Sequence, residues 1–389
     1  MKKIQFLSAI FFVALISLPL SAQIEPGKPG EKEIVMTVES EVSSTPVKNQ
    51  SKTGTCWSYA MVSFLESELL RTKKTEFDLS EMYFVRLAYP QKAMYYVRLQ
   101  GKAVFSEGGQ AHDVLNIMRN FGAVPENVYP GIQYDEQLHN HNEMTAILQG
   151  MLLGITKNEG GRLTDRWPDA VNSVLDVYLG KIPEHFAYEG KEYTPVDFSN
   201  KVLKIDPDNY IELTSFSHHP FYTQFDLEIA DNWAHSDYYN IPLDEMMQVI
   251  DNAIQEGYSI CWDGDITGLE FSQQTGIAMV HETDWSKLTK EQKTTILLGQ
   301  EPEKVITQDS RQINFDNYTT TDDHLMHVTG IATGDNGTRY YITKNSWGVN
   351  NKYDGKMYMS EAYVRLNTIA IMVHKDAVPE EIAKKLNIN

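Results

Sequence analysis

The sequence reads Gln50-Ser51-Lys52-Thr53-Gly54-Thr55-Cys56-Trp57 where its first helical pattern begins. From Cys56 to Leu65, apolar residues recur at helical spacing. The pattern therefore predicts that Cys56 stands at a helix N-terminus, where the helix dipole and free N–H groups stabilise a thiolate and lower its pKa. A lone cysteine is more often a small buried hydrophobe, so this stretch alone does not identify a nucleophile.

Three further segments contain residue types that suit the same chemistry. They are Glu107-Gly108-Gly109-Gln110, then Asp323-His324-Leu325-Met326-His327, and finally a strand-like run that ends in Asn345-Ser346-Trp347-Gly348. Together with the stretch around Cys56, and in this order, they resemble the papain-like cysteine peptidases. The four matches extend over most of the chain.

The resemblance implies a complete peptidase site. Cys56 is then the nucleophile, His324 the acid–base residue, and Asn345 the residue that orients the imidazole, while Trp347 covers that contact. The side-chain amide of Gln50 and the backbone N–H of Cys56 form the oxyanion hole. No metal or organic cofactor is required by this chemistry.

Two histidines compete for the catalytic role. The alternation from Val328 to Thr333 predicts a strand, and residues three apart on a strand face opposite sides, so only one of His324 and His327 can face Cys56. In the family pattern a glycine follows the histidine by six positions, as Gly330 follows His324. His324 is therefore the predicted catalytic residue, and His327 is interpreted as a core or rear-face histidine.

The spacing of the motifs identifies a branch of the family. Cys56 and His324 are 268 positions apart, against about 130–150 in papain-type enzymes. This resembles the bleomycin hydrolase and aminopeptidase C branch, in which a papain core carries a long, largely helical insertion. The branch resemblance also rests on Gln110 and on Val378-Pro379-Glu380-Glu381 before a closing helix. It implies that Gly108 and Gly109 bind an extended peptide substrate through their backbones.

The expected fold is α+β and papain-like, with two lobes. A helical left lobe begins at Cys56, an antiparallel β lobe extends from about 258 to 373, and the insertion occupies about 131–255 of a peptidase domain at 23–389. Within the insertion the periodicity predicts helices at 138–157, 165–178 and 243–257, and then a strand at 258–262. Cys261 in this strand is expected to be a buried structural residue.

Composition and the N-terminal segment bear on partners and location. With 34 basic and 53 acidic residues the formal charge is -19, which repels phosphate backbones and makes nucleic acid a poor candidate partner. Lys2 and Lys3 precede an apolar run from Phe6 to Leu20, and small residues up to Ala22 suit signal peptidase. The run is short for a membrane span of about 20 residues. We expect cleavage after Ala22 and export to the periplasm or the medium, with an uncleaved anchor as the alternative.

The sequence also contains pairs of histidines and pairs of acidic residues outside these motifs. Metal binding is not expected at His218-His219 or at His139 with His141, because adjacent histidines on a strand point apart and no ligand framework accompanies them. The acidic pairs Asp322-Asp323 and Asp263-Gly264-Asp265 are interpreted as solvated loops. The alternative is that they attract the free ammonium group of a substrate.

The resemblance implies hydrolysis of peptide bonds, with aminopeptidase action as the first hypothesis. In the branch, a C-terminal arm lies in the cleft and its carboxylate meets the amino group of the substrate. Here ten residues follow Pro379, so we expect that the arm does not reach. An endopeptidase with an open cleft, acyl transfer to an acceptor other than water, and a peptide-binding pseudoenzyme remain as alternatives. Family members often form hexamers that enclose their active sites, and weaker assembly is expected here.

Overall fold

A computed structural model describes residues 34–158, 160–283, 285–297 and 302–388. The predicted signal peptide, residues 1–22, lies outside the described residues. No helix in the described ranges is long and apolar enough to cross a membrane.

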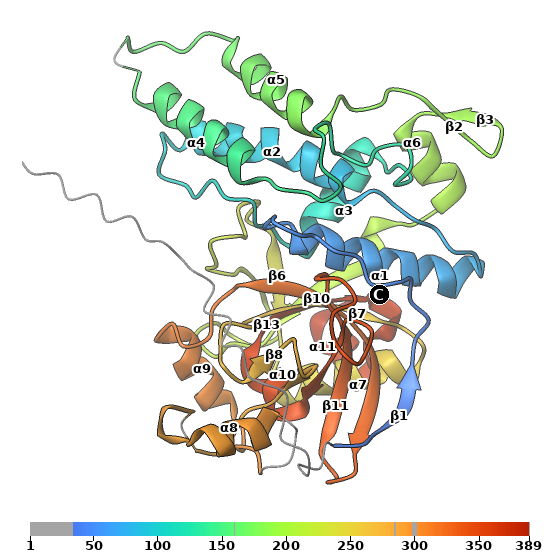
Figure 1. Cartoon of the computed structure of the whole chain (residues 1–389), viewed down its shortest axis with the longest axis vertical. Helices are drawn as coiled ribbons and strands as arrows, with labels where there is room; N and C mark the ends of the chain where they lie inside the picture. Colours follow the sequence, from blue (N-terminus) through green and yellow to red (C-terminus); the bar gives the residue numbers. More distant parts are fainter. Residues whose placement is uncertain (1–33, 159, 284, 298–301, 389) are drawn as a thin grey trace, which may run out of the picture. The chain divides into compact units, whose positions relative to one another are not determined.

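The helical lobe is built around α1 (Cys56–Lys73), which packs against α2 (Glu81–Arg98) and α3 (Ala111–Phe121) on one side and against the sheet on the other (Figure 1). Every residue of α1 from Cys56 to Leu69 is buried. A helix enclosed in this way has no solvent-facing side, so most of its residues are apolar or small, and its carboxylates Glu66 and Glu68 are buried exceptions. The helix that the sequence predicts at Cys56 is therefore confirmed, and it is central to the molecule.

The β lobe is one sheet of eleven strands, most of them antiparallel. Its centre is β10 (His324–Gly334), which pairs with β7 (Ile260–Gly264), β11 (Arg339–Lys344) and β1 (Met36–Glu41). The other strands are β4 (Tyr210–Thr214), β5 (Gln224–Asp226), β6 (Asp237–Asn240), β8 (Phe271–Ser272), β9 (Ile277–Ala278), β12 (Lys356–Ser360) and β13 (Thr368–His374). Leu325 faces the core around α1, while its neighbour Met326 packs in the core on the opposite face of the sheet.

That opposite face is covered by helices. They are α7 (Leu243–Gln255) and α11 (Glu380–Leu386), which share one apolar core with β7, β10 and β13. The remaining helices near the sheet are α8 (Lys290–Leu297), α9 (Gln308–Asp316) and α10 (Glu361–Asn367), with short 3-10 turns at Trp285–Lys287 and Lys375–Ala377. The predicted papain-like α+β architecture is confirmed.

The inserted segment has two halves of different character. Its first half forms α4 (Asn142–Thr156) and α5 (Trp167–Leu179), which pack against α2 and thicken the helical lobe. The second half holds a hairpin of β2 (Phe186–Tyr188) and β3 (Lys191–Tyr193), the short α6 (Pro195–Asp197), a π-helical turn (Phe198–Leu203), a 3-10 turn (Pro207–Asn209), and strands β4 to β6. The regular structure of the insertion is thus mostly helical, as expected, because α7 (Leu243–Gln255) also falls within 131–255. Its second half adds strands, among which β4 pairs with β13 and extends the sheet.

Candidate active site

Cys56 and His324 lie where the two lobes meet. Cys56 is the first residue of α1 and His324 the first residue of β10, and the backbone of Leu325 donates a hydrogen bond to the Cys56 thiol. Both side chains are buried, with 8% of Cys56 and 3% of His324 exposed. The start of the helix and the start of the strand therefore place these two residues at one junction.

The hydrogen bonds of Asn345 determine the tautomer of His324. Nε2 of His324 lies 2.8 Å from Oδ1 of Asn345, which also accepts the backbone N–H of Ser346 at 2.7 Å. Nδ2 of Asn345 donates to Gln273 at 2.7 Å, so the amide cannot be turned round. Nε2 of His324 must then carry the hydrogen, and Nδ1 remains as the basic nitrogen. The Trp347 ring lies over this pair, 5.0 Å from the imidazole.

Gln50 is attached to the same C-terminal segment. Its backbone N–H donates to the carbonyl of Ser346 at 2.8 Å, and its Oε1 accepts the Ser346 hydroxyl at 2.5 Å. Nε2 of Gln50 donates one hydrogen to the carbonyl of Thr53 at 2.7 Å. Since the amide nitrogen has two hydrogens, one donor remains for a developing oxyanion.

The pKa of the Cys56 thiol differs from the sequence-based prediction. Burial raises the pKa of the Cys56 thiol to about 12, and the carboxylates of Asp231, Asp263 and Asp322 add to this effect. Burial lowers the pKa of His324 to about 4, although its bond to Asn345 acts in the opposite direction. A helix N-terminus contributes about 0.3–2 kcal/mol, whereas three pKa units correspond to about 4 kcal/mol. The direction is therefore opposite to the lowered thiol pKa that the sequence predicts.

The three carboxyl groups near Cys56 form what we call the acidic pocket, made of Asp231, Asp263 and Asp322. Asp263 lies on β7 and is 3% exposed, and neither of its oxygens accepts a hydrogen bond from an N–H or O–H group of the described residues. Its side chain instead contacts the carboxyl group of Asp322, which accepts a hydrogen bond from Gln110 at 3.0 Å. Asp231 accepts a hydrogen bond from Ser106 at 3.0 Å.

Carboxyl groups in contact repel one another when ionised. Burial, together with the charge of Asp231, raises the pKa of Asp322 to about 7, and burial together with Asp322 raises that of Asp263 well above its usual value. The expectation of solvated loops is wrong for Asp263 and also for Asp265, which is buried and accepts the backbone N–H groups of Thr267 and Thr321. Asp265 thus shapes a turn, while Asp263 has no such structural partner.

Gly108 and Gly109 lie against the acidic pocket and α1. A Cβ atom on Gly108 would stand 1.8 Å from Oδ2 of Asp231, and one on Gly109 would stand 2.8 Å from Asp113 and 3.1 Å from the Trp57 ring. Close approach therefore requires glycine at both positions. Sequence reasoning identified the glycines but missed Asp231 and Gln273, because neither stands next to a motif along the chain.

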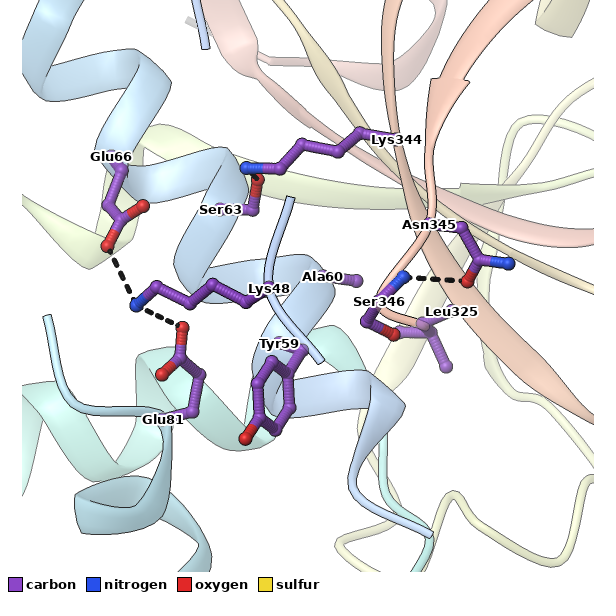
Figure 2. Close-up of a pocket in the computed structure, with 10 residues that line it drawn as sticks. All are labelled: Lys48, Tyr59, Ala60, Ser63, Glu66, Glu81, Leu325, Lys344, Asn345 and Ser346. Atoms are coloured by element: carbon purple, nitrogen blue, oxygen red, sulfur yellow. Dashed lines mark hydrogen bonds and ion pairs between the residues drawn. The ribbon is translucent and has the colours of Figure 1, made fainter. Parts of the chain in front are cut away.

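A buried polar network supports the site from behind (Figure 2). A cavity of about 10 Å³, enough for roughly one water molecule, is lined by Lys48, Tyr59, Ala60, Ser63, Glu66, Glu81, Leu325, Lys344, Asn345 and Ser346. Nζ of Lys344 donates to Ser63 of α1 at 2.7 Å, and Ser63 also bonds Nδ1 of His327 at 2.8 Å. His327 is fully buried, as expected of a core histidine. The network fixes α1 to the end of β11, directly before Asn345.

The second cysteine takes no part in the site. Cys261 lies on β7, is 1% exposed, and packs in the core around α1. Both cysteines carry free thiols. The structure therefore supports the interpretation of Cys261 as a buried structural residue.

Comparisons with known proteins agree with this architecture. The model of the Peptidase C1-like family matches residues 22–389, so the chain belongs to that family. Aminopeptidase C of Listeria monocytogenes is 22% identical over 97% of this chain and 91% of its own length, and aminopeptidase C of Lactococcus lactis is 22% identical over 88% and 83%. Mitochondrial cysteine proteinase 1 of Saccharomyces cerevisiae is 21% identical over 88% and 77%. The crystal structure of PepW from Lactobacillus rhamnosis superposes with a TM-score of 0.69 at 18% identity, covering 90% of this chain and 84% of the other. The chain is thus a cysteine peptidase with a papain-like fold.

Proposed function

We propose that this cysteine peptidase is an aminopeptidase in which Cys56 attacks the peptide carbonyl and His324 transfers the proton. Asn345 orients the imidazole, and Gln50 with the backbone N–H of Cys56 stabilises the oxyanion. The observation that carries the aminopeptidase assignment is the acidic pocket beside Cys56. Gly108 and Gly109 bind the substrate backbone, and Trp347 shields the bond between His324 and Asn345.

The proposed reaction proceeds through proton transfers between Cys56, His324, the leaving amine and water. Sγ of Cys56 gives its proton to Nδ1 of His324 as it bonds to the carbonyl carbon. The imidazolium then protonates the leaving amine, which departs from a thioester on Cys56. Water, deprotonated by the same imidazole, releases the amino acid and restores the thiol.

A free N-terminus suits the acidic pocket chemically. An ammonium group can donate to several carboxylate oxygens at once, and such charge-assisted hydrogen bonds are stronger than neutral ones. Asp231 and Asp322 are partly exposed and accessible to a substrate, while the unpartnered oxygens of Asp263 lie deeper. Binding a cation there also offsets the negative charges that raise the pKa of Cys56, so a substrate with a free N-terminus activates its own nucleophile.

The described C-terminal residues lie away from Cys56. Ile388 lines a groove with Tyr258, and the Arg71 guanidinium stacks 4.0 Å over the Tyr258 ring. Arg71 is fifteen residues along α1 from Cys56, about 22 Å at 1.5 Å per residue. We infer that the acidic pocket takes the part that a C-terminal carboxylate plays in the branch this chain resembles.

The test uses two matched fluorogenic peptides, one with a free and one with an acetylated N-terminus, under reducing conditions. Wild type should cleave only the free peptide, and Cys56→Ala neither. Asp231→Asn should lose activity on the free peptide. Cleavage of the acetylated peptide at a similar rate would establish an endopeptidase instead. Cleavage of neither would favour a peptide-binding protein or a different acyl acceptor, which product analysis by mass spectrometry would reveal.

We also propose that the chain is exported. The basic residues Lys2 and Lys3, the apolar run after them and the small residues up to Ala22 support this. Mass spectrometry of the N-terminus of protein recovered from the periplasm or medium tests it, with Gln23 as the expected first residue.

A further inference from the structure

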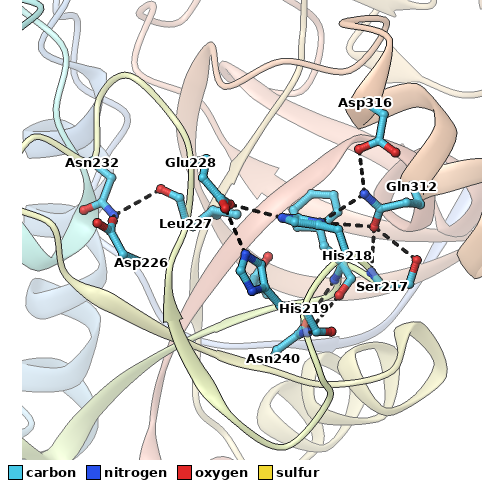
Figure 3. A network of polar contacts seen from close by, with 12 residues as sticks. Ser217, His218, His219, Asp226, Leu227, Glu228, Asn232, Asn240, Gln312 and Asp316 are labelled. Atoms are coloured by element: carbon cyan, nitrogen blue, oxygen red, sulfur yellow. Dashed lines mark hydrogen bonds and ion pairs between the residues drawn. The ribbon is translucent and has the colours of Figure 1, made fainter.

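Two adjacent histidines and one glutamate converge within the inserted segment, away from the Cys56 motif. Nε2 of His218 lies 3.1 Å from Oε2 of Glu228, and Nε2 of His219 lies 2.9 Å from Oε1 of the same carboxylate (Figure 3). One ligand atom of each residue lies within 4.8 Å of the others. The sequence-based reasoning that adjacent histidines point apart does not apply, because His218 and His219 stand in the loop between β4 and β5, not in a strand.

Aromatic rings hold the two imidazoles in place. The His219 ring stacks on Phe225 with centroids 4.1 Å apart, and the His218 ring lies parallel to Phe315 at 5.7 Å. Preorganised rings lose little freedom when an ion binds. The three ligand side chains are therefore positioned before any ion arrives.

Gln312 supports His218 from behind (Figure 3). Its Oε1 accepts the backbone N–H of Ser217 at 2.6 Å and its Nε2 donates to Asp316 at 2.8 Å, which fixes the amide. Nδ1 of His218 lies 3.0 Å from Nε2 and 3.4 Å from Oε1 of this amide. Oε1 therefore lies within reach of the Nδ1–H that a metal-bound imidazole carries, in place of the present contact with Nε2. A metal-ligating histidine usually has such an outer partner.

We propose that His218, His219 and Glu228 bind one divalent transition-metal ion, with Zn²⁺ as the ion that the donor set favours. Two imidazoles and one carboxylate match zinc sites with three protein ligands and an open fourth position, whereas Mg²⁺ and Ca²⁺ prefer oxygen alone. His218 and Glu228 are exposed and His219 is partly exposed, which leaves a path for the ion and for a water ligand.

The ion clamps the loop that carries Asp231. Glu228 stands three residues before Asp231, and Asn232 closes the loop by donating to Asp226 at 2.8 Å. A metal bond from Glu228 to His218 and His219 ties the two sides of β5 together. The importance of this clamp for substrate binding rests on the proposed function, whereas metal binding itself does not.

The experiment titrates Zn²⁺ into EDTA-treated Cys56→Ser protein by isothermal calorimetry, since the substitution prevents the active-site thiol from binding zinc. One equivalent should bind. His219→Ala and Glu228→Gln in the same background should weaken binding by more than the roughly 10–100-fold seen for losses of outer partners. His185→Ala is the matched control, because His185 makes a solitary surface pair with Glu192 at 3.7 Å.

Thermal melting and deuterium exchange provide two further tests of the metal site. Zn²⁺ should raise the Tm of the Cys56→Ser protein and of its His185→Ala variant, and should leave the Tm of the His219→Ala and Glu228→Gln variants at their metal-free values. Zn²⁺ should also slow deuterium exchange in 217–232, and unchanged exchange there would overturn the clamp. The metal site itself is wrong if no equivalent binds, or if binding survives both ligand substitutions.

Discussion

Replacing Asp322 with asparagine separates the stability of the acidic pocket from its function. The asparagine side chain retains the shape of the aspartate and an oxygen that can accept the hydrogen bond from Gln110. The substitution removes one of the two carboxyl groups that contact each other, and the new amide can donate to the unpartnered oxygens of Asp263. If the acidic pocket binds a cation, the substitution should raise the free energy of unfolding and lower kcat/KM on a peptide with a free N-terminus.

The size of the stability gain follows from the pKa of Asp322. That pKa is about 7 in the folded protein against 3.8 for an ordinary aspartate, and three units correspond to an upper limit of about 4 kcal/mol. Asp322 is partly exposed, so solvent screening reduces the expected gain to about 1–2 kcal/mol. Because the folded pKa is raised, the penalty is absent below pH 4, grows between pH 4 and 7, and is constant above.

The assay is urea unfolding of wild type and Asp322→Asn at pH 4 and pH 8, combined with steady-state kinetics. The variant should match wild type at pH 4 and exceed it at pH 8. On the free peptide its kcat/KM should fall about 10–100-fold, the loss of one charged hydrogen bond of about 1.5–3 kcal/mol. Asp208→Asn removes the same charge from an exposed pair with Arg119 and should change neither quantity markedly. A variant less stable than wild type at pH 8, or equally impaired on any residual cleavage of the acetylated peptide, would refute the reasoning.

Three further predictions concern the catalytic groups. Gln50→Ala should lower kcat by about 10²–10³ with little change in KM, as expected for a lost oxyanion donor. A fall in Tm large enough to explain the lost activity by unfolding would contradict that role. His324→Ala should abolish turnover under conditions where urea unfolding shows the variant to be fully folded, whereas His327→Ala should cost about 2–4 kcal/mol in urea unfolding and retain turnover at low temperature, because His327 fills buried space beside Ser63. Alkylation of Cys56 by iodoacetamide should accelerate with pH through pH 9, since burial raises the thiol pKa to about 12; a plateau below pH 7 would show an ion pair in the free enzyme.

The sequence by itself determined the elements that local patterns encode. Periodicity placed the helix at Cys56 and those within 138–157, 165–178 and 243–257 to within a few residues, and alternation placed the strand after His324. Motif order identified the family, because the motifs around Cys56, His324 and Asn345 are short stretches whose residue types can be read without their three-dimensional surroundings. These are properties that a short window of residues contains.

Only the tertiary structure decided what depends on burial and on distant partners. The acidic pocket joins Asp231 of the insertion to Asp263 of β7 and Asp322 before β10, and the zinc proposal joins a loop after β4 to Glu228 after β5. A pKa depends on the solvent and charge around a group. At Cys56, burial and those carboxylates raise the thiol pKa, against the lowering that a helix N-terminus produces by itself. Spacing along the chain does not contain such distances, because they are set by how the sheet and α1 pack.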